Sequence, residues 1–233
     1  GEAGRGEAGR GEAGRGEAVD ARAREAIALS IDRAAIVNFI LQKEGEAAGG
    51  LLPQWSSGTA FLFSTAADAA HAKELSAQIV PAAKIVLGYD FGDSLEQAVA
   101  ERIAVNAREA GIQLTAQAIR PRATPDVDAR LVRLRMQSKL PAAALENFMD
   151  ALGAMTKIEA AALPDARTPE DIHNRERAIV SSYRVVPLVW LPRVYGLSAR
   201  VRDWTAPGAG EMWPLADVWL DGPPEAGSDE GKK

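Results

Sequence analysis

The residues best suited to hold a small charged solute are an aspartate and an arginine that follow predicted strands. Tyr89 and Asp90 come at the end of one apolar run, and Arg135 comes near the end of another. The Asp90 carboxylate could accept hydrogen bonds from an ammonium group, and the Arg135 guanidinium could hold a carboxylate through two parallel hydrogen bonds. The alternative is that Asp90 and Arg135 pair with each other or face solvent.

A large aromatic side chain, Trp55, lies in the glycine-rich loop predicted at residues 45–58. Such a side chain is unexpected in a loop unless it covers something. It is either a wall of a ligand site or an apolar plug that anchors the loop, and the sequence favours neither. The candidate ligand-binding residues are therefore Trp55, Tyr89, Asp90 and Arg135.

The residue types that most catalytic and metal sites require are absent or scattered. The chain has no cysteine, and its two histidines, His71 and His173, lie far apart on predicted helices without a third ligand at a suitable spacing. It has no nucleophile elbow, phosphate-binding loop or dinucleotide fingerprint. The glutamates Glu25, Glu101 and Glu176 have arginine neighbours and are predicted to lie on solvated, salt-bridged helix faces. We therefore expect no catalytic residue, no metal site, no cofactor and no enzymatic activity.

Residues 84–119 have the pattern of a strand, a helix and a second strand. The run at 84–89 is apolar and β-branched, and 112–119 alternates apolar with polar residues. Between them, Ser94 and Gln97 have the spacing of a capping box, apolar residues recur at helical spacing, and Gly111 stands where a left-handed residue ends a helix. Two strands joined by a helix pair in parallel with a right-handed crossover. The expected fold is α/β, with a mixed, largely parallel sheet flanked by helices.

Other elements are expected to pack around this unit. Thr168 and Pro169, followed by two acids, form a strong helix start. Residues 22–42 are predicted to be helical in two pieces, with Asp32 as the cap of the second. The remaining predicted helices are one capped by Ser64 or Thr65 and running to 78, 141–152 ended by Gly153, and a short one at 157–163. The remaining predicted strands are 128–136, 185–191 and 193–197.

Composition and the two ends of the chain limit the function further. The formal net charge of −5 argues against nucleic-acid binding, and no apolar run reaches the roughly 18 residues of a membrane-spanning helix. Residues 1–18 repeat the pentapeptide GEAGR and, like the polar tail at 223–233, hold too little apolar surface to order themselves. The N-terminus has no basic and then apolar pattern. The targeting segment of an exported protein would therefore lie outside this sequence.

Three segments, in order, resemble the family 5 extracellular solute-binding proteins of ABC transporters. Residues 24–33 read REAIALSIDR, which is similar to the entry into the second lobe of that family. Residues 84–119 match its strand, helix and strand. Residues 186–204, VPLVWLPRVYGLSARVRDW, are similar to its conserved proline, arginine and tyrosine motif and to the tryptophan that follows.

The resemblance implies a periplasmic-binding-protein-like lobe that captures a peptide-like or other small solute for permease subunits at the membrane, in the periplasm or cell envelope. It also implies the domain organisation: an α/β lobe at 19–202 and, at 203–222, a return segment to a first lobe that this chain lacks. Family members are about twice as long, so the chain would act as a half-receptor. Uncovered in this way, Trp204, Trp213 and Trp219 are expected to be exposed, and the cleft face would be available for self-association.

Two rival functions remain from the sequence. One is an orphan lobe that serves as a protein interaction or structural module. The other, ranked third, is an enzyme. Binding of a small solute would favour the transport function, a stable oligomer would favour the interaction module, and turnover of a peptide would favour the enzyme.

Overall fold

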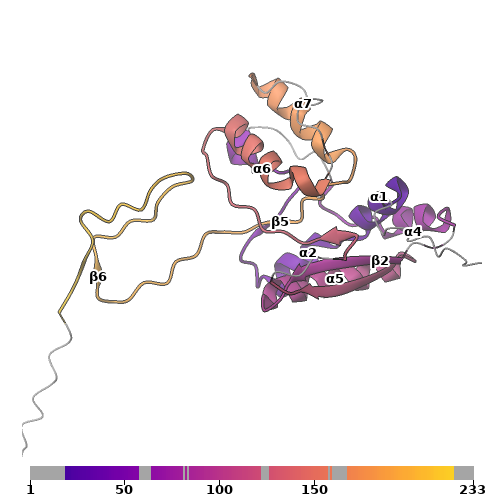
Figure 1. Cartoon of the computed structure of the whole chain (residues 1–233), viewed down its shortest axis with the longest axis horizontal. Coiled ribbons are helices and arrows are strands. Elements are labelled where there is room, and N and C mark those ends of the chain that lie inside the picture. Colours follow the sequence, from indigo (N-terminus) through magenta and orange to yellow (C-terminus); the bar gives the residue numbers. More distant parts are fainter. Residues whose placement is uncertain are drawn as a thin grey trace, which may run out of the picture. The chain divides into compact units, whose positions relative to one another are not determined.

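The strand, helix and strand predicted at the centre are present. In the computed structural model, β2 (Lys84–Asp90) pairs in parallel with β3 (Gln113–Ile119), from Lys84 opposite Gln113 to Asp90 opposite Ile119. Helix α5 (Ser94–Glu109) connects them and runs along one face of the pair (Figure 1). A short strand, β4 (Ala129–Arg130), joins the other side of β2, also in parallel. The sheet order is therefore β3-β2-β4, and the predicted α/β class is confirmed.

The structure describes residues 19–57, 64–80, 82, 84–121, 126–156, 158 and 167–222. The chain divides into two compact units. The first takes the described residues up to Asp32 and those of Ala66–Val132, and the second takes Arg33–Thr65 and those from Arg133 onward. The repeat at 1–18, the tail at 223–233 and nearly all of the predicted helix at 157–163 lie outside the described residues.

The ends of α5 follow from local chemistry, with one correction to the sequence analysis. Asp93, not Ser94, is the cap, because its Oδ1 atom accepts a hydrogen bond from the Glu96 amide at 2.9 Å. Gly111 has a φ of +86°, the left-handed conformation that was predicted. A Cβ atom at Gly88 would lie 2.5 Å from Cδ1 of Ile119, so a side chain at position 88 would require the Ile119 side chain to move.

Two further helices, α1 (Ala21–Ser30) and α4 (Ala69–Ala77), pack against each other and against α5 in the first unit. The cap of α4 is Asp68, which accepts a hydrogen bond from the His71 amide at 3.0 Å, so the prediction of Ser64 or Thr65 was wrong. The core of this unit consists of apolar side chains from the sheet and from these helices. Its main members are Ala23, Ala26, Ala72, Ile85, Leu87, Val99, Ile103, Ala107 and Leu114.

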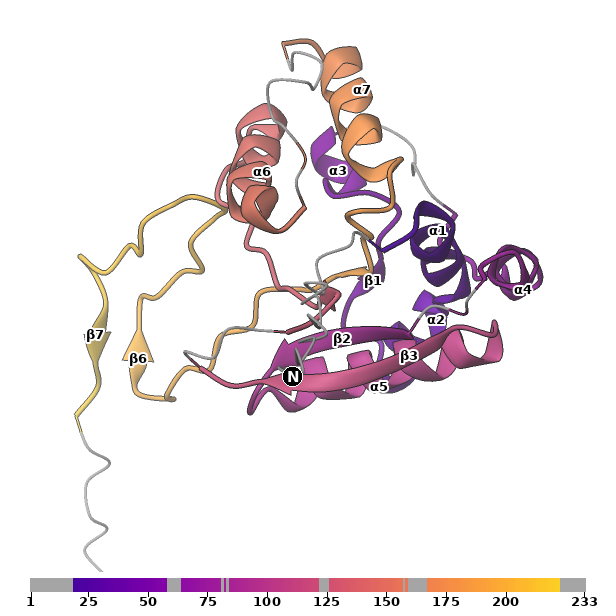
Figure 2. The same ribbon diagram turned by 45° about the vertical axis from the view of Figure 1, so that its right-hand side comes forward.

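The second unit is built on two helices, α6 (Pro141–Thr156) and α7 (Pro169–Val180), which pack together (Figure 2). The start of α7 is the predicted one: Thr168 and Asp171 form a reciprocal capping box. The expected end of α6 at Gly153 was wrong, because the buried face continues from Leu152 to Thr156, one turn later. A single glycine inside a helix costs only about 1 kcal/mol, which such burial offsets.

The remaining elements of the second unit are short: α2 (Arg33–Ala35), the π-helical turn η1 (Ile36–Ile40), β1 (Glu46–Ala47), α3 (Gln54–Ser57), β5 (Val189–Trp190), β6 (Val201–Arg202) and β7 (Trp219–Leu220). Strand β1 pairs antiparallel with β5, and β6 pairs antiparallel with β7. The predicted strands at 185–191 and 193–197 therefore shrink to two paired residues. Pro187 and Pro192 flank them and lack the N–H group that a longer ladder would use.

The predicted strand at 128–136 is likewise reduced to Ala129 and Arg130. The Leu131 amide still donates to the Gly88 carbonyl at 2.8 Å, but the chain passes into the second unit at Arg133. Beyond that point it no longer follows β2. Leu134 and Met136 instead pack against the core of the second unit.

Candidate functional site

The carboxyl end of β2 brings opposite charges together on the surface of the first unit. Oδ1 of Asp90 accepts a hydrogen bond from Nη2 of Arg130 at 2.7 Å, and both side chains are exposed. The parallel register sets Arg130 of β4 opposite Gly88 of β2. Gly88 precedes Asp90 by two residues on β2. The ion pair considered for Asp90 therefore exists, with Arg130 in place of Arg135. Sequence reasoning missed Arg130 because it extended the third strand to residue 136.

A buried glutamate of α5 is hydrogen-bonded to the backbone at this end of β2. Oε2 of Glu96 accepts a hydrogen bond from the Asp90 amide at 3.0 Å, and the Glu96 side chain is buried at the first turn of α5. It fixes the backbone that presents Asp90. No sequence signal distinguished Glu96 from the exposed acids of the same helix, since its role depends on the approach of β2.

The same edge carries an exposed aromatic side chain beside a second arginine. Phe91 continues the pairing with β3, because its amide donates to the Ile119 carbonyl at 2.9 Å. The Arg120 guanidinium carbon lies 5.7 Å from the centre of the Phe91 ring, within the range of a cation–π interaction. Tyr89, two residues before Phe91 in the sequence, is half-buried. The edge therefore offers one carboxylate, two guanidinium groups and an aromatic face to a solute.

The other two candidate residues belong to the second unit. Trp55 lies on α3 and is 74% exposed, so the alternative of a core plug that anchors the loop was wrong. Arg135 is exposed, on the segment between β4 and α6. The structure thus places Tyr89 and Asp90 in one unit and Trp55 and Arg135 in the other.

Two charged side chains are buried among the described residues of the second unit. Glu176, on α7, is 1% exposed, which corrects the prediction of a solvated face, and burial raises its pKa above the ordinary value. Its Oε1 atom accepts hydrogen bonds from the amides of Leu51 and Leu52, at 2.5 and 2.9 Å. Nε of Arg33 donates to the Pro187 carbonyl at 2.9 Å, and burial lowers the Arg33 pKa. Both side chains bind backbone and hold loops in place.

The two histidines lie on separate helices among the described residues. His71 contacts Glu74 of α4 at 3.4 Å, and Nε2 of His173 lies 3.0 Å from Arg177 of α7. Within the described part of the chain, no group of three or more potential ligands could hold a metal ion. None of the helices found there combines the length and the apolar character needed to cross a membrane.

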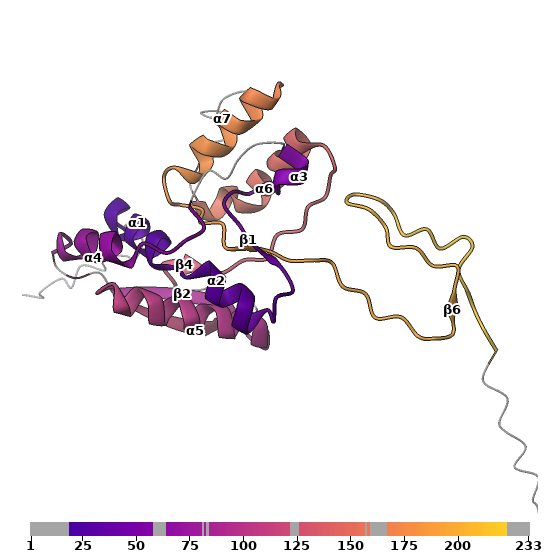
Figure 3. The same cartoon turned by 180° about the vertical axis from the view of Figure 1, so that it is seen from behind.

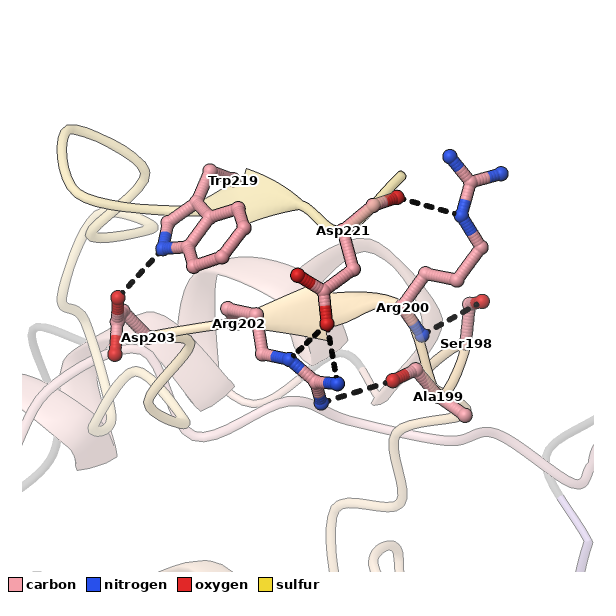
Figure 4. A network of polar contacts seen from close by, with 7 residues as sticks. All are labelled: Ser198, Ala199, Arg200, Arg202, Asp203, Trp219 and Asp221. Carbon is pink, nitrogen blue, oxygen red and sulfur yellow. Dashed lines mark hydrogen bonds and ion pairs between the residues drawn. The ribbon is translucent and has the colours of Figure 1, made fainter. Parts of the chain in front are cut away.

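The segment from residue 193 to 222, which we call the C-terminal arm, is tied together by polar contacts. Figure 4 shows Oδ2 of Asp221 accepting a hydrogen bond from Nε of Arg202 at 2.7 Å, and Nε1 of Trp219 donating to Asp203 at 2.7 Å. Nearer α6, Glu211 accepts hydrogen bonds from Lys139 and from the Gly208 amide, which lower its pKa. These contacts give the arm a defined course.

Aromatic rings on the C-terminal arm are less covered than tryptophans usually are. Trp213 and Trp219 are 53% and 51% exposed, as predicted, whereas Trp204 is half-buried against Tyr195, with ring centres 5.0 Å apart. We expect red-shifted fluorescence that iodide quenches readily. Because Trp55 is itself 74% exposed, the test is made in a Trp55→Phe background. There, replacement of Trp213 and Trp219 by phenylalanine should remove much of the quenchable emission, whereas Trp190→Phe should retain it. A blue-shifted, unquenched spectrum would contradict this description of the arm.

Residues 17–155 match the family described as bacterial extracellular solute-binding proteins, family 5 Middle. No curated protein sequence matches the chain. The substrate-binding protein CtaP of Listeria monocytogenes has a similar fold, with a TM-score of 0.64 and 17% identity over 86% of this chain and 47% of that one. NikA of Staphylococcus aureus, solved with Ni(L-His)2, has a TM-score of 0.62 and 16% identity over 86% of this chain and 48% of its own. OppA of Haemophilus influenzae, solved with the peptide RPPGFSPFR, has a TM-score of 0.62 and 13% identity over 86% of this chain and 45% of its own.

These structures establish the fold, and their names describe binding proteins rather than enzymes. The chain spans less than half the length of each of them.

Proposed function

The chain belongs to family 5 of the bacterial extracellular solute-binding proteins, and we propose that it is a solute-binding component of an ABC transporter. It would capture a peptide-like or other small solute in the periplasm or cell envelope and present it to permease subunits at the membrane. The observation that carries the proposal is the family match over residues 17–155. Solved relatives that hold a peptide or a nickel–histidine complex support a small polar solute.

We place the solute at the carboxyl end of β2, beside Tyr89 and Asp90. In open α/β sheets, ligands bind beyond the carboxyl ends of the parallel strands. The Asp90 carboxylate would take an ammonium group of the solute, and Arg130 would then be free to hold a carboxylate. Trp55 and Arg135, in the second unit, remain proposed solute-binding residues of that unit: Trp55 would offer an apolar wall, and Arg135 would hold a carboxylate.

The exposed ion pair suits this exchange of partners. A surface pair of opposite charges contributes only about 0–1 kcal/mol in water, so a solute that replaces one partner gives up little. The same charges interact more strongly once water is excluded. A second wall that closes over the edge would therefore strengthen the contacts to the solute. The half of each relative that this chain does not cover is where we place that wall.

One wall alone is expected to bind weakly. Ligand pockets bury about 70–90% of a small ligand, and one wall can cover only part of that surface. A receptor with a dissociation constant of about 1 μM has a binding free energy near −8 kcal/mol. Loss of half of the contacts removes much of the gross interaction, whereas the cost of immobilising the solute, several kcal/mol, stays nearly whole. We expect dissociation constants in the millimolar range or weaker for this chain.

An NMR titration of the full chain with trialanine tests the site. We expect amide shifts near Asp90, Phe91, Arg120 and Arg130 in the first unit and near Trp55 and Arg135 in the second. Trialanine blocked at both ends should produce no such shifts. Asp90→Asn should weaken the shifts in the first unit severalfold while changing the free energy of unfolding by less than about 1 kcal/mol, because an exposed pair stabilises little. Asp150→Asn, on the exposed face of α6, is the matched control and should leave the titration unchanged.

Three other outcomes would each change the proposal. A dissociation constant below about 100 μM, near −5.5 kcal/mol, would show that the chain carries a complete site. Shifts at the same residues with the nickel–histidine complex and none with trialanine would replace the peptide by a metal chelate. If both probes fail to produce local shifts at tens of millimolar, solute binding at this edge is contradicted.

A second function, a protein interaction or structural module, has its own support on the C-terminal arm. Apolar side chains are exposed there: Val194, Met212, Trp213, Leu215, Trp219 and Leu220. Exposed apolar patches promote association, including self-association. Sedimentation equilibrium distinguishes the two functions. A tight dimer that Met212→Ser and Trp213→Ser dissociate would favour the module, and a monomer that passes the trialanine test would favour the receptor.

A further inference from the structure

A buried carboxylate holds the loop that leads into α3. Glu176 is 1% exposed on α7, and a single oxygen, Oε1, accepts hydrogen bonds from two successive amides, those of Leu51 and Leu52. The neighbouring positions on this face of α7, Ile179 and Val180, are apolar and buried. An apolar residue at 176 would continue that face but would leave both amides without an acceptor. The Glu176 carboxylate therefore serves as the hydrogen-bond acceptor of the loop amides and does not only fill space in the core.

The loop is shaped to receive this carboxylate. A Cβ atom at Gly50 would lie 2.6 Å from Oε1 of Glu176, so only a residue without a side chain allows the backbone so close. On the other side of the two amides, Leu52 is buried in the core of the second unit. Gly50 thus leaves room for the Glu176 carboxylate, and the buried Leu52 side chain anchors the loop to the core.

The loop in turn sets the position of α3. Helix α3 has four residues, and so short a helix has little stability of its own. It begins directly after Pro53, whose carbonyl accepts a hydrogen bond from the Ser56 amide at 2.9 Å. It packs against α7, which also contacts α6 (Figure 3). Trp55 is 74% exposed, so burial of its own side chain does not hold it.

We propose that Glu176 is the positioning residue for Trp55, because its two hydrogen bonds to the loop determine where α3 presents the indole ring to a solute. This inference rests on the proposed function, in which Trp55 is a solute-binding wall of the second unit. It assigns the specificity of that wall to a residue that never touches the solute. Variation at position 176 would then alter solute selection without a change in the wall itself.

Fluorine NMR of the full chain labelled with 5-fluorotryptophan tests this positioning without any ligand. The chain has five tryptophans, and Trp55→Phe assigns the resonance of interest. In Glu176→Leu, which keeps bulk but removes the acceptor, we expect the Trp55 resonance to shift or split while the other four stay in place. Glu176→Gln retains an acceptor oxygen and should restore the original Trp55 resonance.

Each contrary outcome overturns the inference. An unchanged Trp55 resonance in folded Glu176→Leu would show that α3 is held by other contacts. Movement of all five resonances together would show a general structural role. If Glu176→Leu does not fold, Gly50→Ala replaces it, since a methyl group there must separate the loop from Oε1, and the same selective change at Trp55 is expected. Failure of solute binding would contradict the proposed function and leave these spectra interpretable.

Discussion

Replacing Leu145 with alanine is expected to lower the free energy of unfolding by about 2–5 kcal/mol, the range for a buried leucine that leaves a cavity. Leu145 is fully buried on α6, in a cluster with Phe148, Met149 and Ile179. Two rigid helices and the buried Leu52 surround it, so the neighbours have little freedom to fill the space. Urea denaturation followed by circular dichroism measures the loss.

Leu140→Ala is the matched control for this prediction. Leu140 directly precedes α6 and is 69% exposed, so the same chemical change there should alter stability by no more than about 0.5 kcal/mol. Equal effects of the two substitutions would mean that α6 does not bury the face described above.

Replacing Glu176 with alanine is expected to cost about 2–4 kcal/mol at pH 7. The change removes the acceptor of two backbone amides, the buried one of Leu52 and the partly buried one of Leu51. A buried amide left without a partner costs about 1–3 kcal/mol, although the loop can relax in part. Glu176→Gln is the matched variant. It keeps the shape and one acceptor oxygen, so the free energy of unfolding should change by less than about 1 kcal/mol. Similar losses for both variants would contradict the roles given to the two hydrogen bonds.

The difference in the free energy of unfolding between the wild-type chain and Glu176→Gln should depend on pH, with a definite sign. Burial raises the Glu176 pKa above the 4.5 of a glutamate in water, although the amides of Leu52 and Leu51 lower it in part. The stability associated with the raised pKa is fully present below pH 4.5 and is lost as the pH rises through the folded-state value. Relative to Glu176→Gln, the wild-type chain should therefore become less stable between pH 4.5 and neutrality. Urea midpoints of both proteins across this interval measure the difference.

Elements encoded by adjacent residues were predictable from the sequence. The strand, helix and strand at 84–119 and the start of α7 depend on signals within a few residues: an apolar run, helical spacing, Gly111 and the Thr168–Asp171 box. The family resemblance rests on similarly local segments. Even there, the cap of α5 was misplaced by one position, because aspartate and serine cap helices almost equally well.

The extent of strands and the end of α6 depended on partners distant in the sequence. A strand forms only where another chain segment pairs with it, and β1 offers β5 just two residues. The apolar alternation at 128–136 was a sound pattern, but only Ala129 and Arg130 lie beside β2. Gly153 did not end α6, because burial of Thr156 beyond it outweighed the local preference of glycine.

The candidate site shows the same division between local chemistry and tertiary structure. The sequence by itself determined that a carboxylate, Asp90, follows a parallel strand, where a solute can reach it. The tertiary structure decided its partner, because the register between β2 and β4 brings in Arg130. It also decided that Glu176 and Glu96 are buried while Glu101 and Glu109 are exposed. The physical reason is that the charge of a side chain is a property of the residue. Its burial and its ion-pair partner are properties of the residues that folding brings beside it.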